Sequence, residues 1–350
     1  MIKRTACIIA RGHDPYHNLA VEKHLMDTLL EDTAILYLWQ NQHTIMMGRN
    51  QNPWYECKVE EFLRSGGCIA RRLSGGGAVY HDLGNLNFTI ILPKSEFDVF
   101  KQMSIVSMAL SAFGIQAEIS GRNDIQVQGR KISGNAYYKA GRSAYHHGTL
   151  LVNANMDWMT HYLTVDKKKL EGRGAQSLPA RVVNLQSLKA EITIQSLQEM
   201  LCRAFARMYR TSPTVIDEYM LDAPTIDKLS EEFQNNDWIY PAALPYTFTV
   251  TERFPWGGIT VKLLQEGGII RQAKIFTDAM EASLFNLIEQ ALVGAPYLIS
   301  AIGSRFEQKL EMLTDPVLLQ MAQDVCSLIC GRMRAIDRAN EHPAEADAEA

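Results

Sequence analysis

Residues 70–82 read Ala-Arg-Arg-Leu-Ser-Gly-Gly-Gly-Ala-Val-Tyr-His-Asp, and the local fold depends on this stretch. The flanking segments 68–72 and 78–81 have the character of short strands, so the glycine triplet forms the turn between them. Glycine reaches positive φ at low cost and lets a ligand approach the backbone closely. Two arginines directly before the turn place guanidinium groups beside free backbone N–H groups, which suits a phosphate or a carboxylate. The stretch therefore predicts either an anion-binding loop or a purely structural turn.

A second stretch, residues 121–153, predicts a run of strands that carries a lysine beside a tight turn. A polar turn at 121–123 precedes a strand over 124–127, and a turn at Gln128-Gly129 leads into strands over 131–137 and 144–152. Lys131 thus stands where the hairpin re-enters the sheet, followed by small residues. A lysine there can present a compact positive charge to a cleft, although a solvated lysine at a strand end is the commoner arrangement.

Short motifs follow one another along the chain: Asp14-Pro15 with Asn18-Leu19-Ala20, Gly48-Arg49 with Gln51-Asn52-Pro53-Trp54, Arg71-Arg72-Leu73-Ser74-Gly75-Gly76-Gly77-Ala78-Val79-Tyr80-His81-Asp82, Gly121-Arg122-Asn123-Asp124, Arg130-Lys131-Ile132-Ser133-Gly134, His146-His147-Gly148-Thr149-Leu150, and Gly257-Gly258. In this order they resemble the motif set of the lipoate–protein ligase family. The likeness covers nearly the whole chain, and several motifs in register are far more specific than any one alone.

The resemblance implies an enzyme with a two-step reaction. Lipoate and Mg-ATP give lipoyl-AMP and pyrophosphate, and the mixed anhydride then acylates a lysine on a lipoyl carrier domain. The carriers implied are the E2 subunits of 2-oxoacid dehydrogenase complexes and the glycine cleavage H protein. Because the first step brings a carboxylate to a polyanion, positive charge has to offset the repulsion and stabilise charge on the α-phosphate.

The resemblance also implies which residues do this. Lys131 is the expected catalytic residue, bridging the lipoate carbonyl and the α-phosphate, and Asp124 is the expected Mg²⁺ ligand. The residues expected to bind ATP and the adenylate are Arg72, Gly77, Ala78, Val79, Tyr80, Asn123, Asp124 and Lys131. The residues expected to bind lipoate are Leu19, Arg72, Ser74, Gly77, His81, Lys131 and His147.

Two neighbouring histidines raise the question of whether the sequence contains a metal site. His146 and His147 are adjacent on a predicted strand, so they face opposite sides and do not chelate one metal together. For each histidine, a structural role with hydrogen bonds and a contact with the ligand are about equally good explanations. The six cysteines lack paired spacing with histidines, so the sequence predicts no zinc site.

Composition indicates a cytoplasmic globular enzyme. The chain has 350 residues, 47% of them hydrophobic, which is enough for about two domains. A net charge of −4 argues against nucleic acid as the main partner. The six scattered cysteines suit reduced thiols, and residues 1–10 read as a first strand instead of a signal peptide. No apolar run is long enough to span a membrane, and a monomer is expected.

Periodicity outlines the remaining elements. Residues 34–40 and 44–47 alternate and predict paired strands, and 85–92 predicts a longer strand. Helical stripes cover 97–113 and 193–208. The C-terminal part predicts a hairpin over 258–264 and 269–276, followed by helices over 279–292, 305–314 and 316–333.

The fold expected is α+β: a mixed-sheet catalytic domain, similar by resemblance to biotin protein ligases, plus a small α+β C-terminal domain. The catalytic domain is assigned to residues 1–240 and the accessory domain to 251–338. Residues 235–245 contain Pro241 and Pro245 with little periodicity and predict a linker, assigned to 241–250. The Ala/Glu-rich tail, 339–350, is expected to be disordered.

A charged segment departs from the family pattern. In the family the region equivalent to 166–183 is a loop that closes over the adenylate and excludes water. Here Leu178-Pro179-Ala180 follows Ser177, where relatives commonly carry an arginine and a second serine. Loop closure and the hold on the adenylate are therefore open.

Other functions remain as alternatives. A lipoyltransferase that accepts preformed lipoyl-AMP stays open because of the altered loop. An octanoyltransferase would need a cysteine, and none lies between Cys68 and Cys202. A non-catalytic adenylate-binding regulator would be expected to lose the lysine or the Arg-Asn-Asp turn, and both are present. A biotin ligase would need a Gly-Arg-Gly-Arg-Arg-Gly-type loop, which the sequence lacks.

Overall fold

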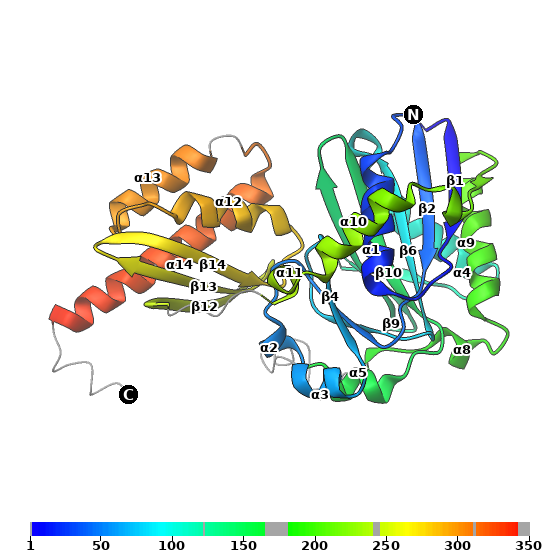
Figure 1. Cartoon of the computed structure of the whole chain (residues 1–350), viewed down its shortest axis with the longest axis horizontal. Coiled ribbons are helices and arrows are strands. Elements are labelled where there is room, and N and C mark those ends of the chain that lie inside the picture. Colours follow the sequence, from blue (N-terminus) through cyan, green and yellow to red (C-terminus); the bar gives the residue numbers. More distant parts are fainter. Residues whose placement is uncertain (1, 122, 165–180, 241–245, 311–312, 342–350) are drawn as a thin grey trace. The chain divides into compact units, whose positions relative to one another are not determined.

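The structure is a computed structural model that describes residues 2–121, 123–164, 181–240, 246–310 and 313–341, with side chains described as far as residue 336 (Figure 1). The chain divides into two compact units. The first contains Met1–Gly48, Asn52–Ser74 and Ala78–Pro241. The second contains Ala242–Ala350 together with two short segments from earlier in the chain, Arg49–Gln51 and Gly75–Gly77.

An eight-stranded mixed sheet forms the centre of the first unit, in the order β11-β1-β2-β6-β10-β9-β8-β7. Its strands are β1 (Arg4–Ile9), β2 (Thr33–Trp39), β6 (Asn85–Pro93), β7 (Glu118–Ser120), β8 (Asp124–Val127), β9 (Arg130–Ala140), β10 (Ser143–Leu151) and β11 (Thr214–Val215). Strand β1 runs parallel to β2 and β11, and the other neighbours are antiparallel. Every residue of β6 is buried, as expected for a strand covered on both faces.

A smaller sheet carries the glycine turn region on its strands. Its order is β4-β3-β5, from β3 (Thr44–Met47), β4 (Cys68–Arg71) and β5 (Val79–His81). Strand β3 is parallel to β4 and antiparallel to β5. The two strands that flank the glycine triplet therefore do not pair with each other, because β3 lies between them.

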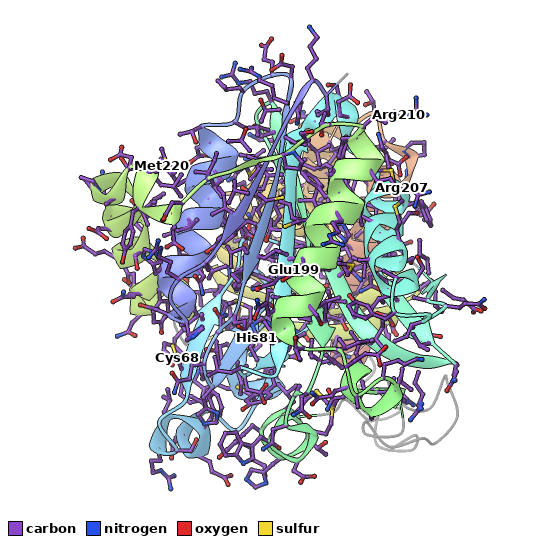
Figure 2. The ribbon with its side chains drawn as sticks, turned by 90° about the vertical axis from the view of Figure 1, so that its right-hand side faces the viewer. Cys68, His81, Glu199, Arg207, Arg210 and Met220 are labelled. Atoms are coloured by element: carbon purple, nitrogen blue, oxygen red, sulfur yellow. The ribbon has the colours of Figure 1, made fainter. Side chains whose placement is uncertain are left out.

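Helices cover both faces of the large sheet (Figure 2). Helices α1 (Pro15–Asp27) and α10 (Ala223–Gln234) lie on one face, and α4 (Val99–Ser111) and α9 (Ile194–Tyr209) on the other. The shorter helical elements are α2 (Pro53–Glu56), α3 (Val59–Arg64), η1 (Lys94–Glu96), α5 (Met156–Tyr162), α8 (Leu185–Leu188), η2 (Glu218–Met220) and α11 (Asn236–Ile239). The two faces of the sheet thus belong to two different apolar cores.

Capping residues explain where the long helices begin. Asp14 accepts a hydrogen bond from the Tyr16 N–H at the start of α1, and Pro15 takes the first helical position. Thr193 and Ser196 form a reciprocal capping box at the start of α9. Helix α9 ends at Arg210, which adopts the left-handed conformation with φ 53°.

The second unit is a three-stranded antiparallel meander packed against helices. The strands are β12 (Phe248–Phe254), β13 (Gly257–Glu266) and β14 (Ile269–Thr277), in that order. The helices are α12 (Ala282–Leu292), α13 (Ile299–Leu310) and α14 (Pro316–Glu341). Buried side chains from both layers, including Val261, Phe285 and Val325, form a separate hydrophobic core.

The expected α+β fold with a mixed sheet and a small C-terminal sheet-and-helix part is confirmed. The pairing predicted for 34–40 with 44–47 is wrong, because β2 lies between β1 and β6 whereas β3 lies between β4 and β5. Nearly all of β2 is buried, and such a strand needs neighbours and packing on every side. Part of the expected linker has regular structure, since α11 occupies Asn236–Ile239 and β12 begins at Phe248.

Some expectations concern residues outside the described part of the chain. These are most of the loop at 166–183, including Leu178-Pro179-Ala180, residues 241–245 of the linker, and residues 342–350 of the tail. Among the helices that the structure does describe, none combines the length and apolarity needed to cross a membrane.

Candidate active site

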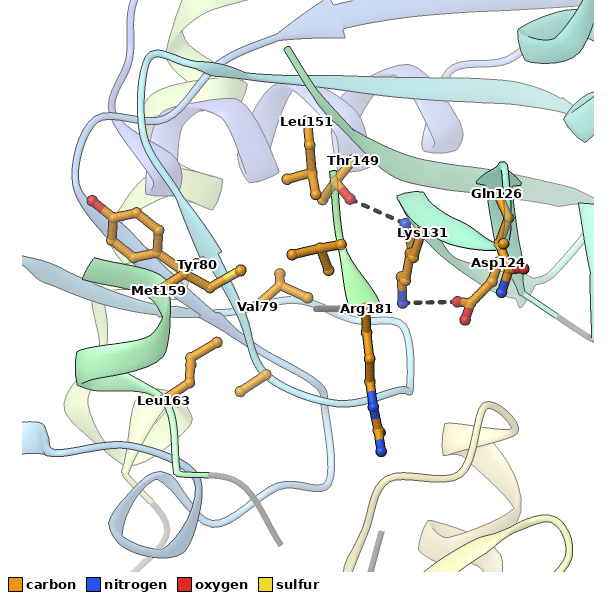
Figure 3. A pocket seen from close by; sticks show the side chains of 14 residues that line it. Val79, Tyr80, Asp124, Gln126, Lys131, Thr149, Leu151, Met159, Leu163 and Arg181 are labelled. Atoms are coloured by element: carbon orange, nitrogen blue, oxygen red, sulfur yellow. Dashed lines mark hydrogen bonds and ion pairs between the residues drawn. The ribbon is translucent and has the colours of Figure 1, made fainter. Parts of the chain in front are cut away.

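A pocket of about 450 Å³ opens at the β8–β9 hairpin of the first unit (Figure 3). We refer to it as the Lys131 pocket. Its lining residues come from β5 and the segment before it, the hairpin, β10, α5 and the residues that follow it, and the segment before α8: Ala78, Val79, Tyr80, Asp124, Gln126, Gly129, Lys131, Gly134, Thr149, Leu151, Met159, Leu163, Arg181 and Val182. It contains five of the residues predicted from sequence, namely Ala78, Val79, Tyr80, Asp124 and Lys131.

The hairpin turn fixes where Lys131 stands. Gln128 and Gly129 both have positive φ, 53° and 73°, as a two-residue type I′ turn requires. The Lys131 Nζ atom lies 2.7 Å from Asp124 Oδ1, so the two charges meet across the hairpin (Figure 3). Their side chains are 34% and 19% exposed, which leaves the ion pair accessible from the pocket.

Gly134 makes room for the lysine. A Cβ atom built on Gly134 would lie 2.9 Å from Lys131 Nζ and 3.0 Å from Lys131 Cε, so the end of the lysine side chain would have to shift. The Gly134 N–H donates to Thr149 Oγ1 at 3.2 Å, which holds β9 against β10 at this point. The missing Cβ of Gly134 therefore leaves the space that the ammonium group occupies.

The opposite wall of the pocket is apolar. Figure 3 shows Val79, Met159 and Leu163 on the side away from the Lys131–Asp124 pair. Tyr80 turns its ring to the same side, while its hydroxyl lies 3.1 Å from His43 Nδ1. Burial raises the pKa of Tyr80, so its phenol stays neutral at ordinary pH. A pocket with one charged wall and one apolar wall fits a ligand with an anionic and a flat or apolar part.

A second group, which combines four predicted residues with two that were not predicted, is buried. It comprises Glu22, Arg72, Ser74, His81, Thr89 and His147, which we call the Arg72 cluster. The Arg72 Nε–H donates to Ser74 Oγ at 3.0 Å, and Ser74 Oγ lies 2.8 Å from His147 Nε2. The Nδ1 atom of His147 lies 2.8 Å from Glu22 Oε1. Three residues predicted to bind lipoate are thus joined by one hydrogen-bonded chain.

The electrostatics of the cluster keep Arg72 charged and His81 neutral. Burial lowers the pKa of Arg72 to about 10, which still leaves it protonated at neutral pH. Burial, together with the nearby Arg72 and His147, lowers the pKa of His81 to about 3. The Nδ1 atom of His81 lies 3.1 Å from the Asn41 side-chain amide nitrogen.

The adjacent arginines have different environments. Arg71 donates to the carbonyl oxygens of Trp238 and Gly48 at 2.8 and 2.9 Å, and to that of Ile239 at 2.6 Å. These contacts tie β4 to the end of α11, which gives Arg71 a structural role. Neighbouring residues of an extended segment point to opposite sides, so only Arg72 reaches the cluster.

The glycine triplet lies in the second unit. The Gly76 N–H donates to the Ala279 carbonyl oxygen at 3.1 Å, and a Cβ on Gly75 would lie 2.3 Å from that same oxygen. The positive φ predicted for this turn falls on Gly76, at 87°, and not on Gly77. A Cβ on Gly77 would meet nothing within 4 Å. The positive φ of the triplet is therefore at its middle glycine.

Two further predicted residues have evident packing roles. Asn123 precedes β8 and donates its side-chain N–H to the Asn135 carbonyl oxygen at 3.4 Å, while the Asn135 N–H donates to the Asn123 carbonyl oxygen at 2.9 Å. Leu19 is 1% exposed on the sheet-facing side of α1 and packs in the core that α1 shares with the sheet. His146 and His147 face opposite sides of β10, as predicted: His146 Nε2 lies 3.1 Å from Asn135 Oδ1, on the other side from Glu22.

Sequence reasoning missed the residues that complete both sites. Gln126, Thr149, Met159, Leu163 and Arg181 line the Lys131 pocket. Thr149 lies in the motif His146-His147-Gly148-Thr149-Leu150 but was not assigned to the site, and the other four belong to no quoted motif. Glu22 and Thr89 belong to the Arg72 cluster. Glu22 had a usable signal, because Asn18, Glu22 and Leu25 share one helical face and a carboxylate on an apolar face needs partners.

The described residues offer limited support for a metal. No three His, Cys, Asp or Glu side chains gather in the described part of the chain as a preformed metal site. Asp124 supplies one carboxylate to the Lys131 pocket, and Mg²⁺ bound to a nucleotide commonly uses one or two carboxylates plus phosphate oxygens. The donor set thus fits a metal that arrives with its nucleotide.

Comparison with known proteins identifies the family. The "Lipoyl protein ligase A/B catalytic domain" family matches residues 14–206, and the "Bacterial lipoate protein ligase C-terminus" family matches residues 243–315. The chain is 37% identical over 328 residues to "Lipoate-protein ligase A" of Psychrobacter cryohalolentis, covering 91% of this chain and 96% of the relative.

Solved structures agree in fold. The crystal structure of P. falciparum LipL1 in complex with lipoate matches with a TM-score of 0.81 and 27% identity, covering 93% of this chain and 99% of that one. A crystal structure of a lipoate-protein ligase A bound with ATP matches with a TM-score of 0.58 and 21% identity, covering 68% of this chain and 98% of that one. At the latter identity the likeness concerns the fold alone.

Proposed function

The chain belongs to the lipoate–protein ligase family, and we propose that it activates lipoate with ATP and transfers the lipoyl group to a lysine of a carrier domain. In the first step a lipoate carboxylate oxygen attacks the α-phosphorus of ATP, and the bond to the β-phosphate breaks to release pyrophosphate. In the second step the carrier lysine attacks the lipoyl carbonyl, and AMP leaves. The placement of Lys131 Nζ in a pocket of about 450 Å³, 2.7 Å from Asp124 Oδ1, carries this proposal.

Lys131 is assigned the catalytic role in both steps. Its ammonium group stands at the pocket surface, held by the hairpin and given room by Gly134. Negative charge develops on the α-phosphate oxygens in the first step and on the carbonyl oxygen in the second. A preorganised cation at that position stabilises both, and lysine supplies a compact charge without the planar geometry of arginine.

The nucleotide end is assigned to Gly77, Ala78, Val79, Tyr80, Asn123, Asp124 and Lys131, and Arg72 is assigned to a phosphate or carboxylate oxygen. Support comes from the apolar wall made by Val79 and Tyr80 opposite the charged hairpin. Asp124 would hold Mg²⁺ together with phosphate oxygens. Such an ion would neutralise phosphate charge when bound, and Lys131 would supply positive charge at the reacting carboxylate.

The acyl end is assigned to Leu19, Arg72, Ser74, Gly77, His81, Lys131 and His147. Leu19 contributes apolar surface, as an acyl chain requires. The guanidinium of Arg72 would hold a carboxylate or phosphate oxygen. His81, whose pKa is lowered to about 3, stays neutral and would contact the substrate without adding charge.

The partners proposed are lipoyl carrier domains of 2-oxoacid dehydrogenase E2 subunits or of the glycine cleavage H protein, met by a cytoplasmic monomer. The Lys131 pocket contains no cysteine among its lining residues, which disfavours acyl transfer through a thioester there. Activation with ATP remains the proposal, and a lipoyltransferase that takes preformed lipoyl-AMP is the alternative to test.

Intact-mass measurement tests the function directly. The purified chain is incubated with a lipoyl domain, (R)-lipoate, Mg²⁺ and ATP, and the carrier mass is followed. The proposal expects a shift by one lipoyl group that depends on ATP and on the carrier lysine, with pyrophosphate released in parallel. A carrier variant with that lysine replaced by arginine is the control.

Two other outcomes are informative. A shift obtained with supplied lipoyl-AMP but not with lipoate and ATP would make the chain a lipoyltransferase. No shift under either condition would contradict the proposed function.

A further inference from the structure

We propose that Glu22 is a positioning residue, which fixes the Arg72 guanidinium through His147 and Ser74. The inference rests on the proposed function, because it explains how the residue assigned to the substrate carboxylate is held. The chain of contacts runs from Glu22 Oε1 to His147 Nδ1 at 2.8 Å, from His147 Nε2 to Ser74 Oγ at 2.8 Å, and from Ser74 Oγ to Arg72 Nε at 3.0 Å.

The direction of each hydrogen bond follows from the chemistry of the two ends. The Arg72 Nε–H can only donate, so Ser74 Oγ accepts from it. The only other hydrogen-bond partner that the described residues give the Ser74 hydroxyl is His147 Nε2, so the hydroxyl proton points there. His147 Nε2 is then an acceptor, and its ring proton sits on Nδ1, facing the Glu22 carboxylate.

Glu22 is itself held by a second contact. The Thr89 hydroxyl donates to the same Oε1 atom at 2.7 Å, and Thr89 Oγ1 accepts from the Trp39 Nε1–H at 2.9 Å. Because the Trp39 N–H can only donate, the Thr89 proton has to point toward Glu22. The carboxylate therefore receives two donors on one oxygen, and every proton along the chain has one position.

Burial and charge support a carboxylate at this place. Glu22 is 2% exposed, and the buried groups around it include the Arg72 guanidinium, with which it interacts favourably. A buried charge of this kind is stable only where partners compensate it. Removing the carboxylate would leave the His147 Nδ1–H without its acceptor and would free His147 to take the other tautomer. Ser74 would then lose its acceptor, and the guanidinium would lose one of its fixed contacts.

The first test is spectroscopic and needs no activity. In histidine-selective ¹⁵N-labelled wild-type protein, His147, assigned by comparison with His147→Gln, is expected as the neutral ring with the proton on Nδ1. A proton on Nε2, or a doubly protonated ring at neutral pH, would overturn the proposal. This measurement holds whether or not the chain proves to be a ligase.

The second test separates positioning from mere stability. Glu22→Leu removes the acceptor and is expected to lower kcat/KM for lipoate in pyrophosphate release by about tenfold to a hundredfold, mainly through KM for lipoate. Glu22→Gln keeps an acceptor oxygen and should recover part of that loss. Asp27→Asn, a charge removal on the exposed side of the same helix, is the matched control and should leave both constants unchanged.

The outcomes distinguish the two proposals. If the wild type forms no lipoyl-AMP, the proposed function fails while the ¹⁵N result still decides the hydrogen-bond chain. If the wild type is active and the KM for lipoate is unchanged in Glu22→Leu, Glu22 is not a positioning residue. Should Glu22→Leu fail to fold, Thr89→Val removes one donor and is expected to raise KM for lipoate by a smaller factor. An unchanged KM in Thr89→Val would then contradict the proposal.

Discussion

The Lys131 pocket and the Arg72 cluster carry positive charge in opposite ways, although both lie in the first unit. Lys131 is 34% exposed and meets one partly exposed carboxylate. Arg72 is 6% exposed and is held by the hydrogen-bonded chain that ends at Glu22. An accessible cation can exchange its partner for a substrate, whereas an enclosed one presents a prepared surface. The two regions should therefore respond differently to mutation: the pocket in rate alone, and the cluster in both rate and stability.

The largest expected effect is at Lys131. Lys131→Ala should lower both lipoate activation and transfer from supplied lipoyl-AMP by about a hundredfold or more, which corresponds to ~2.7–4 kcal/mol of transition-state stabilisation. Thermal stability should change little, because an accessible ion pair contributes ~0–1 kcal/mol. Pyrophosphate release, carrier mass and a melting curve measure the three quantities.

Lys131→Arg and Lys139→Ala are the matched variants for this test. Arginine should not restore activity, because a planar fork does not replace a compact charge. Lys139 lies on the same strand β9, where its ammonium stacks over Phe97, and its loss should not affect the reaction. Near-normal turnover in Lys131→Ala would contradict the assignment of a catalytic role to the Lys131 pocket.

Acid should lower the free energy of unfolding of the first unit, because two of its buried histidines are held neutral. Burial lowers the pKa of His81 and of His146 from 6.5 to about 3. Between those values the unfolded chain binds protons that the folded chain does not, so the free energy of unfolding falls as the pH drops below 6.5. In that window each histidine lowers the free energy of unfolding by about 1.4 kcal/mol for every pH unit. The pair together lowers it by ~2.7 kcal/mol for every pH unit.

Urea unfolding at several pH values between 7 and 5 measures this slope. His146→Gln keeps a donor for Asn135 Oδ1 and removes one titrating group, so the slope from the pair should fall to about half. A wild-type unfolding free energy that stays level from pH 6.5 to 5 would show that these rings are not held neutral by burial.

Sequence reasoning could place the hairpin of the Lys131 pocket but not the contacts of the Arg72 cluster, for a physical reason. Turn chemistry is local, so Gln128-Gly129 and the small residue after Lys131 identify the hairpin and its lysine from neighbouring letters alone. Several strands and helices follow from periodicity in the same way, whereas the α+β mixed-sheet class was implied by the family resemblance. Site residues that lie in a motif of the family, such as Lys131 and Asp124, could be assigned from the sequence alone.

The cluster depends on contacts between residues far apart in sequence. Glu22 and His147 come from α1 and β10, and Thr89 from β6, so no spacing along the chain reveals that they meet. The pairing of β2 with β3 failed for the same reason, since the hydrophobic pattern fixes strands but not their neighbours. The location of positive φ at Gly76 and not Gly77 depends on the contact with Ala279, which is equally non-local.

A smaller change sharpens the view of how the lysine is placed. Gly134→Ala puts a Cβ 2.9 Å from Lys131 Nζ, so the ammonium group has to move while the strand stays. Activity should fall by about tenfold, because one displaced catalytic group costs ~1.4 kcal/mol or more. Steady-state pyrophosphate release measures the effect. Gly12→Ala, at a glycine with open space and no positive φ, is the control and should behave as wild type. Full activity in Gly134→Ala would mean that the exact place of the ammonium group in the unliganded pocket is unimportant.

The smallest expected effect concerns a partly exposed ion pair outside both regions, between α1 and η2. His17 Nε2 lies 2.6 Å from Glu218 Oε1, and this hydrogen bond raises the pKa of His17 above 6.5 and lowers that of Glu218 below 4.5. The contribution of His17 is complete below pH 6.5 and is lost as the pH rises through its higher folded-state pKa. Glu218 behaves conversely, with its contribution lost as the pH falls through its lowered pKa.

Because His17 is 35% exposed, His17→Gln should cost only ~0.5 kcal/mol at pH 6 and less at pH 8, with catalysis unchanged. Urea unfolding of His17→Gln, Glu218→Gln and the double variant at both pH values measures the coupling. An effect on lipoate activation, or a coupling that grows from pH 6 to 8, would show that surface pairs of this unit are not independent of its two charged sites.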